Sequence, residues 1–484
     1  MKGRKLALLT DLYELTMMQG YFTAGAYKKK VVFDLFYRKN PSGNGYAVTA
    51  GLEQAIEYVN ELRFTKDDIE YLKSLNMFTE DFIEFLKDFR FTGEIYAIPE
   101  GTVVFPQEPL LRVTAPIIEA QLLETALLNI INHQSLIATK ASRVVWAAQG
   151  DPVMEFGLRR AQGPDAGTLG ARAAVIGGCC GTSNVLTGKL FDVPVKGTHA
   201  HSWVMSFSNE ITAFREYARL FPENCLLLVD TYNTLESGVP NAIKVFQEMK
   251  AAGKLTGKYG IRLDSGDLAY LSKCAKIMLE EAGFGDATIS ASSDLDENLI
   301  ASLKSQGAKI NLWGVGTKLI TSDDCPAFGG VYKLASEEDE NGAFIPKIKL
   351  SNNPEKVTNP GIKKVFRIYD KKTKKIKADL IALNDETIDE NQCFTLCDNN
   401  AKWRKMHLAA GTYFVKELLV PIFINGELVY ESPKTMEIQE FCNSEKNSLW
   451  DEHLRLKNPH IVPVDLSDKL TQLKNRLIDE LSFS

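Results

Sequence analysis

Six short polar clusters in the sequence combine residue types that bind anions, sugars or metal ions. Each cluster comes directly after a short apolar run. The clusters are Gly157-Leu158-Arg159-Arg160, Gly197-Thr198-His199-Ala200-His201, Asp230-Thr231-Tyr232, Asp264-Ser265-Gly266-Asp267, Ser292-Ser293-Asp294 and Gly316-Thr317. Arginine side chains can clamp a carboxylate or phosphate with two parallel hydrogen bonds. Carboxylate and hydroxyl oxygens suit ribose hydroxyls or Mg²⁺.

The glycines at the last cluster favour a phosphate ligand. Gly314 and Gly316 flank Val315, and Thr317 comes next. Glycines let backbone amides approach an anion closely, and a threonine hydroxyl adds one donor. A plain structural turn is the alternative. The segment from 181 to 189 resembles a nucleotide-binding loop but lacks its first glycine and its final Ser or Thr, so it is not a P-loop.

The Asp264 cluster has two interpretations. Two carboxylates and a hydroxyl within four residues suit a ribose or a hydrated Mg²⁺. The same residues are also typical of a helix N-cap, and the two roles are compatible. Arg159 and Arg160 point to opposite sides if the preceding strand continues, in which case only one of them faces a pocket.

His199 and His201 are two of six histidines in the chain. Their spacing allows both to face one side as metal ligands, although no third His or Cys lies near them in the sequence. Alternatively, a neutral imidazole in a phosphate-rich pocket is a good nucleophile toward phosphorus. The residue types alone do not select one of the two histidines.

The elements that position these clusters have a regular order. Short apolar runs, each suited to a buried parallel strand, alternate with helical segments. The expected strands are 153–156, 193–195, 226–229, 260–263, 288–291 and 310–315, and the expected helices are 210–220, 240–251, 268–281 and 296–305. In an α/β barrel the carboxyl ends of the strands converge on one face, so the six clusters would line a single pocket. An open doubly wound sheet is the alternative, and eight strands are not discernible.

The flanking regions differ from this pattern. We expect a small N-terminal α/β domain over 1–140, an irregular (β/α) barrel over 141–335 and a C-terminal mixed domain over 336–484. The N-terminal region combines a strand at 31–38, a helix from Leu52, short strands over 91–113 and a helix over 117–138. In the C-terminal region we expect a solvated lysine-rich hairpin tip at 369–375, two strands over 414–430 joined at Asn425-Gly426, and a helix over 468–481.

Composition excludes several functional classes. The net charge is −6, so no basic surface for nucleic acid is implied. The eight cysteines include no C-x-x-C pair, which predicts neither disulfides nor a zinc ribbon. No apolar run reaches the length of a membrane span, and the first residues do not form a signal peptide. We therefore expect a cytoplasmic protein without a membrane or nucleic-acid partner.

Together the clusters resemble those of the nicotinate phosphoribosyltransferase family along nearly the whole chain. The matching motifs are Thr10-Asp11-Leu12-Tyr13, Glu155-Phe156-Gly157-Leu158-Arg159-Arg160, Gly197-Thr198-His199-Ala200-His201-Ser202-Trp203, Arg262-Leu263-Asp264-Ser265-Gly266-Asp267, Gly316-Thr317 and Asn458-Pro459-His460. The resemblance implies an N-terminal α/β domain packed on an irregular α/β barrel. It also implies transfer of phosphoribose from phosphoribosyl pyrophosphate (PRPP) to nicotinate, coupled to ATP hydrolysis, with Mg²⁺ at the leaving group.

The resemblance further implies roles for individual residues. His201 occupies the position that ATP phosphorylates, whereas His199 occupies a variable position. The residues expected to bind nicotinate or PRPP, or to act in catalysis, are Tyr13, Arg159, Thr198, Arg262, Asp264, Ser293, Gly316 and Thr317. Metal ligands are not identified. A homodimer is expected, in which Tyr13 serves the neighbouring subunit. The rival functions are a nicotinamide or quinolinate phosphoribosyltransferase and a non-catalytic barrel that binds a phosphosugar.

Overall fold

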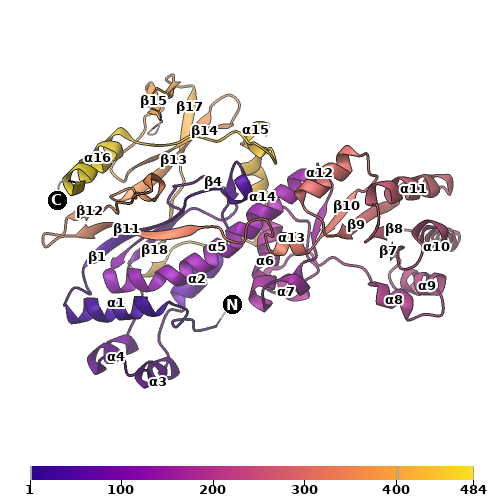
Figure 1. Ribbon diagram of the computed structural model, residues 1–484, viewed down its shortest axis with the longest axis horizontal. Coiled ribbons are helices and arrows are strands. Elements are labelled where there is room, and N and C mark those ends of the chain that lie inside the picture. Colours follow the sequence, from indigo (N-terminus) through magenta and orange to yellow (C-terminus); the bar gives the residue numbers. More distant parts are fainter. Residues whose placement is uncertain (1–2, 399–400, 402, 483–484) are drawn as a thin grey trace. The chain divides into compact units, whose positions relative to one another are not determined.

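The computed structural model describes residues 3–398, 401 and 403–482, and the chain divides into two compact units (Figure 1). The first unit comprises 1–136, 327–433 and 440–484, and the second comprises 137–326 and 434–439. The second unit holds all six polar clusters. The finer division into three domains at residues 140 and 335 stays a prediction.

A parallel five-stranded sheet forms the centre of the second unit. Its strands, in spatial order, are β6 (Val153–Glu155), β10 (Leu312–Val315), β9 (Thr288–Ser293), β8 (Lys258–Leu263) and β7 (Asn224–Leu228). The strands are short and apolar because helices cover the sheet, and side chains such as Leu227, Ile261 and Ala291 are fully buried. The sequence therefore predicted the parallel α/β class and these strands correctly.

The expected strand at 193–195 is wrong. Only Val195 makes a bridge, to Thr182, and Thr182 makes a second bridge to Glu155 on β6. The backbone hydrogen bonds of this extension end at Lys196, whose N–H donates to Thr182 O at 2.8 Å. The structure thus has a parallel sheet lengthened by two single bridges, and its backbone hydrogen bonds do not close a barrel within the described residues.

The helices of this unit come after the strands as expected. Two predicted helices match in full, α9 (Glu210–Leu220) and α11 (Leu268–Glu281), and two match within a residue, α10 (Val239–Ala251) and α12 (Glu297–Ser305). Further helices are η2 (Leu158–Arg160), α6 (Pro164–Ile176), α7 (Val185–Phe191), α8 (His201–Met205), η3 (Thr234–Gly238) and α13 (Thr317–Ile320). Helix α11 packs against β8 and β9, and α9 packs against β7 (Figure 1). The crossover helices therefore hold the strand ends, and the polar clusters next to them, in place.

The first unit contains an antiparallel seven-stranded sheet. Its strands, in spatial order, are β12 (Phe344–Pro346), β11 (Gly330–Glu338), β1 (Lys30–Tyr37), β5 (Leu111–Pro116), β3 (Glu94–Ala97), β18 (Val420–Ile424) and β19 (Glu427–Leu428). Phe33 on β1 stacks on Tyr332 of β11, with 4.6 Å between ring centroids. Strands from both ends of the chain therefore share this sheet.

A mixed four-stranded sheet and two small sheets complete the first unit. The four strands, in order, are β17 (Tyr413–Glu417), β13 (Lys363–Asp370), β14 (Ile376–Leu383) and β20 (Val464–Leu466); the small sheets pair β15 (Phe394–Cys397) with β16 (Lys405–Leu408) and β2 (Ala47–Val48) with β4 (Val103–Val104). The remaining helices are α1 (Leu12–Thr23), η1 (Pro41–Gly43), α2 (Leu52–Asn60), α3 (Lys66–Ser74), α4 (Glu80–Lys87), α5 (Ile117–Ala147), η4 (Pro354–Lys356), α14 (Thr435–Asn447), α15 (Asp451–Leu454) and α16 (Asp468–Ser482).

Two predicted hairpins of this unit had different outcomes. The lysine-rich tip joins β13 to β14, as expected. The turn Asn425-Gly426 also joins two strands, β18 and β19, and both residues have positive φ, as such a two-residue turn requires. However, the run before this turn is not one strand, because β17 and β18 belong to different sheets.

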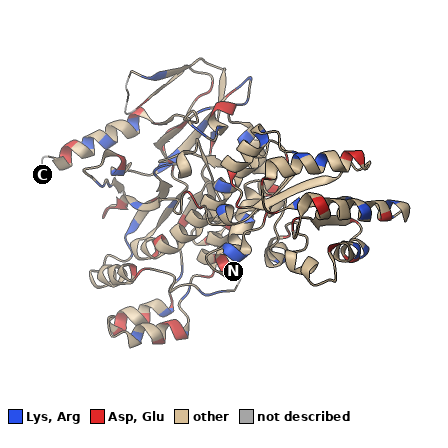
Figure 2. Ribbon diagram, turned by 45° about the vertical axis from the view of Figure 1, so that its right-hand side comes forward, with Lys and Arg blue, Asp and Glu red and all other residues tan. Residues whose placement is uncertain are grey.

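Charged residues of both signs are interspersed along the helices of both units (Figure 2). This pattern agrees with the near balance of 56 basic and 62 acidic residues. Among the described helices, none combines the length and hydrophobicity needed to cross a membrane.

Candidate active site

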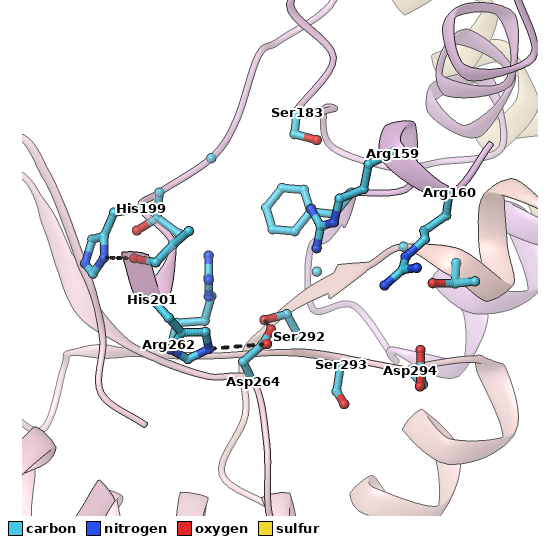
Figure 3. Close-up of a pocket in the computed structure, with 17 residues that line it drawn as sticks. Arg159, Arg160, Ser183, His199, His201, Arg262, Asp264, Ser292, Ser293 and Asp294 are labelled. Carbon is cyan, nitrogen blue, oxygen red and sulfur yellow. Dashed lines mark hydrogen bonds and ion pairs between the residues drawn. The ribbon is translucent and has the colours of Figure 1, made fainter. Parts of the chain in front are cut away.

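One cavity of about 470 Å³ lies at the carboxyl ends of the parallel strands (Figure 3). Residues from five of the six polar clusters line it. The lining residues are Phe156, Arg159, Arg160, Ser183, Gly197, Thr198, His199, Ala200, His201, Arg262, Asp264, Ser292, Ser293, Asp294, Gly314, Gly316 and Thr317. The sheet thus brings Arg262, His201 and Thr317 together, although more than a hundred residues separate the last two in sequence.

Both Arg159 and Arg160 line the cavity. The expectation that only one of them would face it is wrong, because β6 ends at Glu155 and the arginines lie on the 3-10 turn η2. In Figure 3 both side chains extend into the cavity from the side opposite His201 and Arg262. The cavity can therefore clamp an anion from two directions.

Arg262 is the cavity arginine that lies on a strand of the sheet. It lies on β8, and burial lowers the pKa of its guanidinium, while Asp264 and Asp230 act in the opposite direction. Its Nε is buried and has no hydrogen-bond partner among the described residues. A buried donor without a partner is costly, so Arg262 is suited to a carboxylate or phosphate ligand.

His201 is the first residue of α8 and is partly exposed to the cavity. Its Nδ1 lies 3.1 Å from Oγ1 of Thr231, the residue directly after Asp230 beyond the end of β7. Its Nε2 lies 3.7 Å from Oδ2 of Asp264. Each ring nitrogen therefore has an oxygen neighbour, and the Nε2 contact is long enough to leave this atom open to a reacting group.

His199 has a different environment. The side chain is buried beside Tyr217, with 4.6 Å between the ring centroids. Its Nε2 accepts a hydrogen bond from the backbone N–H of Leu228 at 3.2 Å. Burial lowers the pKa of His199 to about 4, so the ring is neutral at neutral pH. The two histidines do not form a metal pair, and the described residues include no group of three His, Cys, Asp or Glu that could hold a metal ion.

Of the acidic cluster, only Asp264 lines the cavity. Its Oδ1 accepts a hydrogen bond from Ser292, and its backbone N–H donates to Oδ2 of Asp230 at 2.8 Å. Ser265 also donates to Asp230, at 2.8 Å, and Asp267 caps α11 through the N–H of Tyr270. Both interpretations of the cluster therefore apply, to different residues: Asp264 is available to a ligand, and Asp267 is a helix cap.

The glycines beside Thr317 make room for Phe156. A Cβ on Gly314 would lie 2.7 Å from the Phe156 ring, and one on Gly316 would lie 3.2 Å from the Phe156 carbonyl oxygen. Ser293 has φ of 146°, which is rare for a residue with a side chain. Ser293, Gly316 and Thr317 all line the cavity, where their backbone and hydroxyl groups can bind a phosphate.

Comparisons with known proteins identify the family. The N-terminal and C-terminal domain models of nicotinate phosphoribosyltransferase match residues 8–132 and 362–474, and the model of the nicotinate phosphoribosyltransferase (NAPRTase) family matches residues 152–325. The nicotinate phosphoribosyltransferase of Bacillus subtilis (strain 168) is 48% identical, over 99% of this chain and 98% of that protein. The chain belongs to this family. The nicotinate phosphoribosyltransferase of Caenorhabditis elegans is 36% identical, over 97% of this chain and 93% of its own length.

Solved structures agree with the NAPRTase assignment. The crystal structure of human nicotinic acid phosphoribosyltransferase superposes with a TM-score of 0.81 at 29% identity, covering 97% of this chain and 99% of that one. The nicotinate-nucleotide pyrophosphorylase of Pyrococcus furiosus has a TM-score of 0.70 at 24% identity, over 92% of this chain and 96% of that chain, which shows a shared fold alone.

Three further cavity residues had no individual role assigned from the sequence, although Asp294 belongs to one of the six polar clusters and Phe156 to a matching motif. Phe156 presents an aromatic ring, Asp294 a second carboxylate and Ser183 a hydroxyl. Phe156 comes directly after β6, so its place at a strand end was a signal that could have identified it. Conversely, Tyr13 was expected to contact nicotinate but does not line this cavity; it is an exposed residue of α1, where partial burial and nearby carboxylates raise its pKa to about 12.

Proposed function

We propose that the protein transfers the phosphoribosyl group of PRPP to the ring nitrogen of nicotinate, releasing nicotinate mononucleotide and pyrophosphate, a reaction of NAD salvage. The observation that carries this proposal is the shared cavity of Arg262, His201 and Thr317 in a chain of the NAPRTase family. The cavity combines cationic, carboxylate and hydroxyl groups, which are the groups that a sugar diphosphate and a pyridine acid require.

Nicotinate binds through its carboxylate and its ring. The nicotinate carboxylate forms an ion pair with the buried guanidinium of Arg262, whose Nε has no hydrogen-bond partner among the described residues. A charge-assisted pair of this kind favours the acid over the neutral amide. Phe156 stacks on the pyridine ring, and Thr198 contacts nicotinate from the adjacent loop.

PRPP binds at the remaining strand ends. Ser293, Gly316 and Thr317 bind phosphate oxygens, and Arg159, on the turn η2 that packs against α13, adds a positive charge. The carboxylate of Asp264 holds ribose hydroxyls. Asp264 and Asp294 also offer the oxygen ligands that suit Mg²⁺, an ion that the diphosphate itself would largely hold. When bound, Mg²⁺ neutralises charge on the departing pyrophosphate.

The chain's own residues then favour the transfer by position and charge. The nitrogen of nicotinate attacks C1′ of the ribose as the bond to pyrophosphate breaks, which leaves positive charge on the sugar. Arg159 and Arg160 stabilise the leaving pyrophosphate, and Arg262 holds nicotinate in line with C1′.

ATP is coupled to this reaction through His201. The unprotonated Nε2 attacks the γ-phosphate of ATP, the bond to ADP breaks, and phosphohistidine forms. The geometry supports this role because Thr231 contacts Nδ1, while Nε2 lies on the side of Asp264, another residue of the cavity. The added charge of phosphohistidine orders the site around PRPP, and the phosphoryl group is hydrolysed after transfer.

The proposal also includes the fold of the second unit and the assembly of the protein. The second unit forms an irregular α/β barrel that backbone hydrogen bonds of the described residues leave open between Lys196 and β7. The protein acts as a cytoplasmic homodimer in which Tyr13 serves the pocket of the second subunit. The exposed apolar residues Val185, Leu186 and Leu190 on α7 support association. Sedimentation velocity tests the homodimer, and a monomer at micromolar concentration would contradict it.

The test of function is a reaction of purified protein with PRPP and Mg²⁺, with and without ATP, and with nicotinate, nicotinamide and quinolinate in turn. We expect pyrophosphate release with nicotinate, stimulated by ATP. Preference for nicotinamide or quinolinate would establish a rival transferase. Binding of PRPP without release of pyrophosphate would establish a non-catalytic phosphosugar-binding protein.

A further inference from the structure

Strand β7 lies at one edge of the parallel sheet and, among the strands that the structure describes, is paired with β8 alone. Val229, just after β7, donates its N–H to Arg262 O on β8 at 3.2 Å. Because backbone groups alternate in direction along a strand, those of Leu226 and Leu228 point to the other side. Their hydrogen bonds must be satisfied there without a further strand.

Two side chains of the polar cluster after Lys196 supply these bonds. Oγ1 of Thr198 donates to Leu226 O at 2.6 Å. Nε2 of His199 accepts from Leu228 N at 3.2 Å. One donor and one acceptor from neighbouring residues therefore match the carbonyl and the amide that a parallel strand would have paired.

The environment of His199 preserves its acceptor nitrogen. The ring packs against Tyr217 and Phe214 on α9, with centroid distances of 4.6 and 6.4 Å, and only 8% of the residue is exposed. Burial lowers the pKa of His199 to about 4. A backbone N–H can only donate, so the neutral ring carries its proton on Nδ1 and keeps Nε2 free to accept.

We propose that Thr198 and His199 form a side-chain latch on the free edge of β7, and that this latch positions His201 for reaction. Backbone bonding reaches Lys196 from the opposite edge of the sheet. The latch spans the interval from Lys196 to β7 with side chains in place of a strand.

The position of His201 depends on the latch because the partners of the two histidines lie close together in the chain. Leu228, the partner of His199, ends β7, and Thr231, the partner of His201, lies just beyond that end. His201 is two residues beyond His199, and Thr231, which contacts its Nδ1 at 3.1 Å, lies three residues beyond Leu228. Loss of the Leu228 bond leaves the loop held to β7 by the Thr198 bond alone. His201 can then move away from Thr231. His199 is thus a positioning residue, and its effect on activity rests on the proposed role of His201.

Two substitutions isolate the acceptor atom. His199→Phe fills the aromatic slot beside Tyr217 but offers no acceptor to Leu228. His199→Gln places an amide oxygen near the former Nε2 position and restores the acceptor. Tyr332→Phe is the matched control, because it removes one buried hydrogen bond, to Ala120 O at 2.9 Å, in the other unit.

The first readout is hydrogen–deuterium exchange of peptides that cover 197–205 and 224–232, in full-length protein without ligands. In His199→Phe we expect exchange in both peptides to rise about tenfold, the effect of losing one hydrogen bond, with no such rise in His199→Gln or Tyr332→Phe. Unchanged exchange in His199→Phe, or equal exchange in the Phe and Gln variants, would overturn the latch.

The second readout is the rate at which radiolabelled ATP phosphorylates His201. We expect about a tenfold loss in His199→Phe and a rate within about twofold of the parent in His199→Gln. Faster hydrogen exchange in His199→Phe with an unchanged phosphorylation rate would overturn the positioning role of His199. Absence of phosphorylation in the parent would instead contradict the proposed function of His201, and the exchange measurement would still decide the latch.

Discussion

Nε2 of His201 lies 3.7 Å from Oδ2 of Asp264, and these residues reach the cavity from segments more than sixty positions apart. The separation exceeds a normal hydrogen bond, so the imidazole is close to the carboxylate without being tied to it. Nδ1 of the same ring contacts Thr231. The histidine therefore has one anchored nitrogen and one nitrogen that is open to chemistry.

Substitution of His201 separates ATP coupling from transfer. We expect His201→Ala to abolish stimulation by ATP and to leave slow ATP-independent transfer, because PRPP and nicotinate bind to other residues. Pyrophosphate release with and without ATP measures both. The control is His407→Ala, since His407 contacts Thr395 on the β15–β16 hairpin outside the cavity. Equal ATP stimulation in His201→Ala and the parent would refute the assignment.

Thr231 anchors the Nδ1 side of His201. Thr231→Val keeps the shape of the side chain and removes its hydroxyl, so we expect ATP stimulation to fall about tenfold, the equivalent of one hydrogen bond. Thr231→Ser retains the hydroxyl and should keep most of the stimulation. The measurement is ATP-dependent turnover at saturating nicotinate. If the Val and Ser variants behave alike, the contact has no role in positioning.

Arg262 is expected to select the acid over the amide. In Arg262→Gln the charge-assisted bonds to the nicotinate carboxylate are lost, which corresponds to about 2 kcal/mol, or roughly 30-fold in kcat/KM. Transfer to nicotinamide should change far less. The ratio of the two kcat/KM values is the informative quantity, because general damage to the site lowers both. An unchanged ratio would contradict the role of Arg262 in substrate selection.

A buried ion cluster stabilises the second unit. Glu297 on α12 is fully buried and forms ion pairs with Lys140 Nζ at 2.8 Å and with Arg143 Nε at 2.9 Å, both on α5. Glu297→Gln removes the negative charge that faces both buried cations, although Lys140 keeps a second partner, Asp324 Oδ1, at 2.6 Å. We expect a loss of about 3 kcal/mol in the free energy of unfolding. Urea denaturation measures it.

The control for the buried cluster is Arg215→Ala. Arg215 pairs with Glu248 at 2.7 Å, but both side chains are more than 40% exposed. Exposed pairs contribute little to stability, so the denaturation midpoint should hardly move. A loss in Arg215→Ala as large as that in Glu297→Gln would mean that burial is not the source of the effect.

The pH dependence of stability reports on His199. Its pKa in the folded protein is about 4, against an ordinary value of 6.5. Between these values the unfolded chain binds a proton that the folded chain does not, so His199 lowers stability progressively as the pH falls from about 6.5 to about 4. We expect the stability difference between the parent and His199→Gln to shift against the parent over this range, measured by thermal unfolding at pH 7.5 and 5. A difference that does not vary with pH would contradict the burial of a neutral ring.

The sequence was sufficient for the class of fold and for most of the cavity. Short apolar runs and the helices between them are local signals, and parallel strands bring the residues after their carboxyl ends to one edge of the sheet. The strand pattern alone therefore predicts that Arg262, Asp264, Ser293 and Thr317 lie together. The fine assignment of nicotinate and PRPP contacts among them stays a prediction.

Only the tertiary structure decided the features that depend on contacts between distant segments. Both Arg159 and Arg160 reach the cavity because they lie on a 3-10 turn, which alternation along a strand does not predict. The separate environments of His199 and His201 arise from β7, some thirty residues later in the chain. The backbone N–H of Leu228 on β7 donates to His199, whereas Thr231, just beyond the end of β7, contacts His201. Residue types and spacing determine which groups are available, whereas the partners of each group are set by segments that meet only when the chain folds.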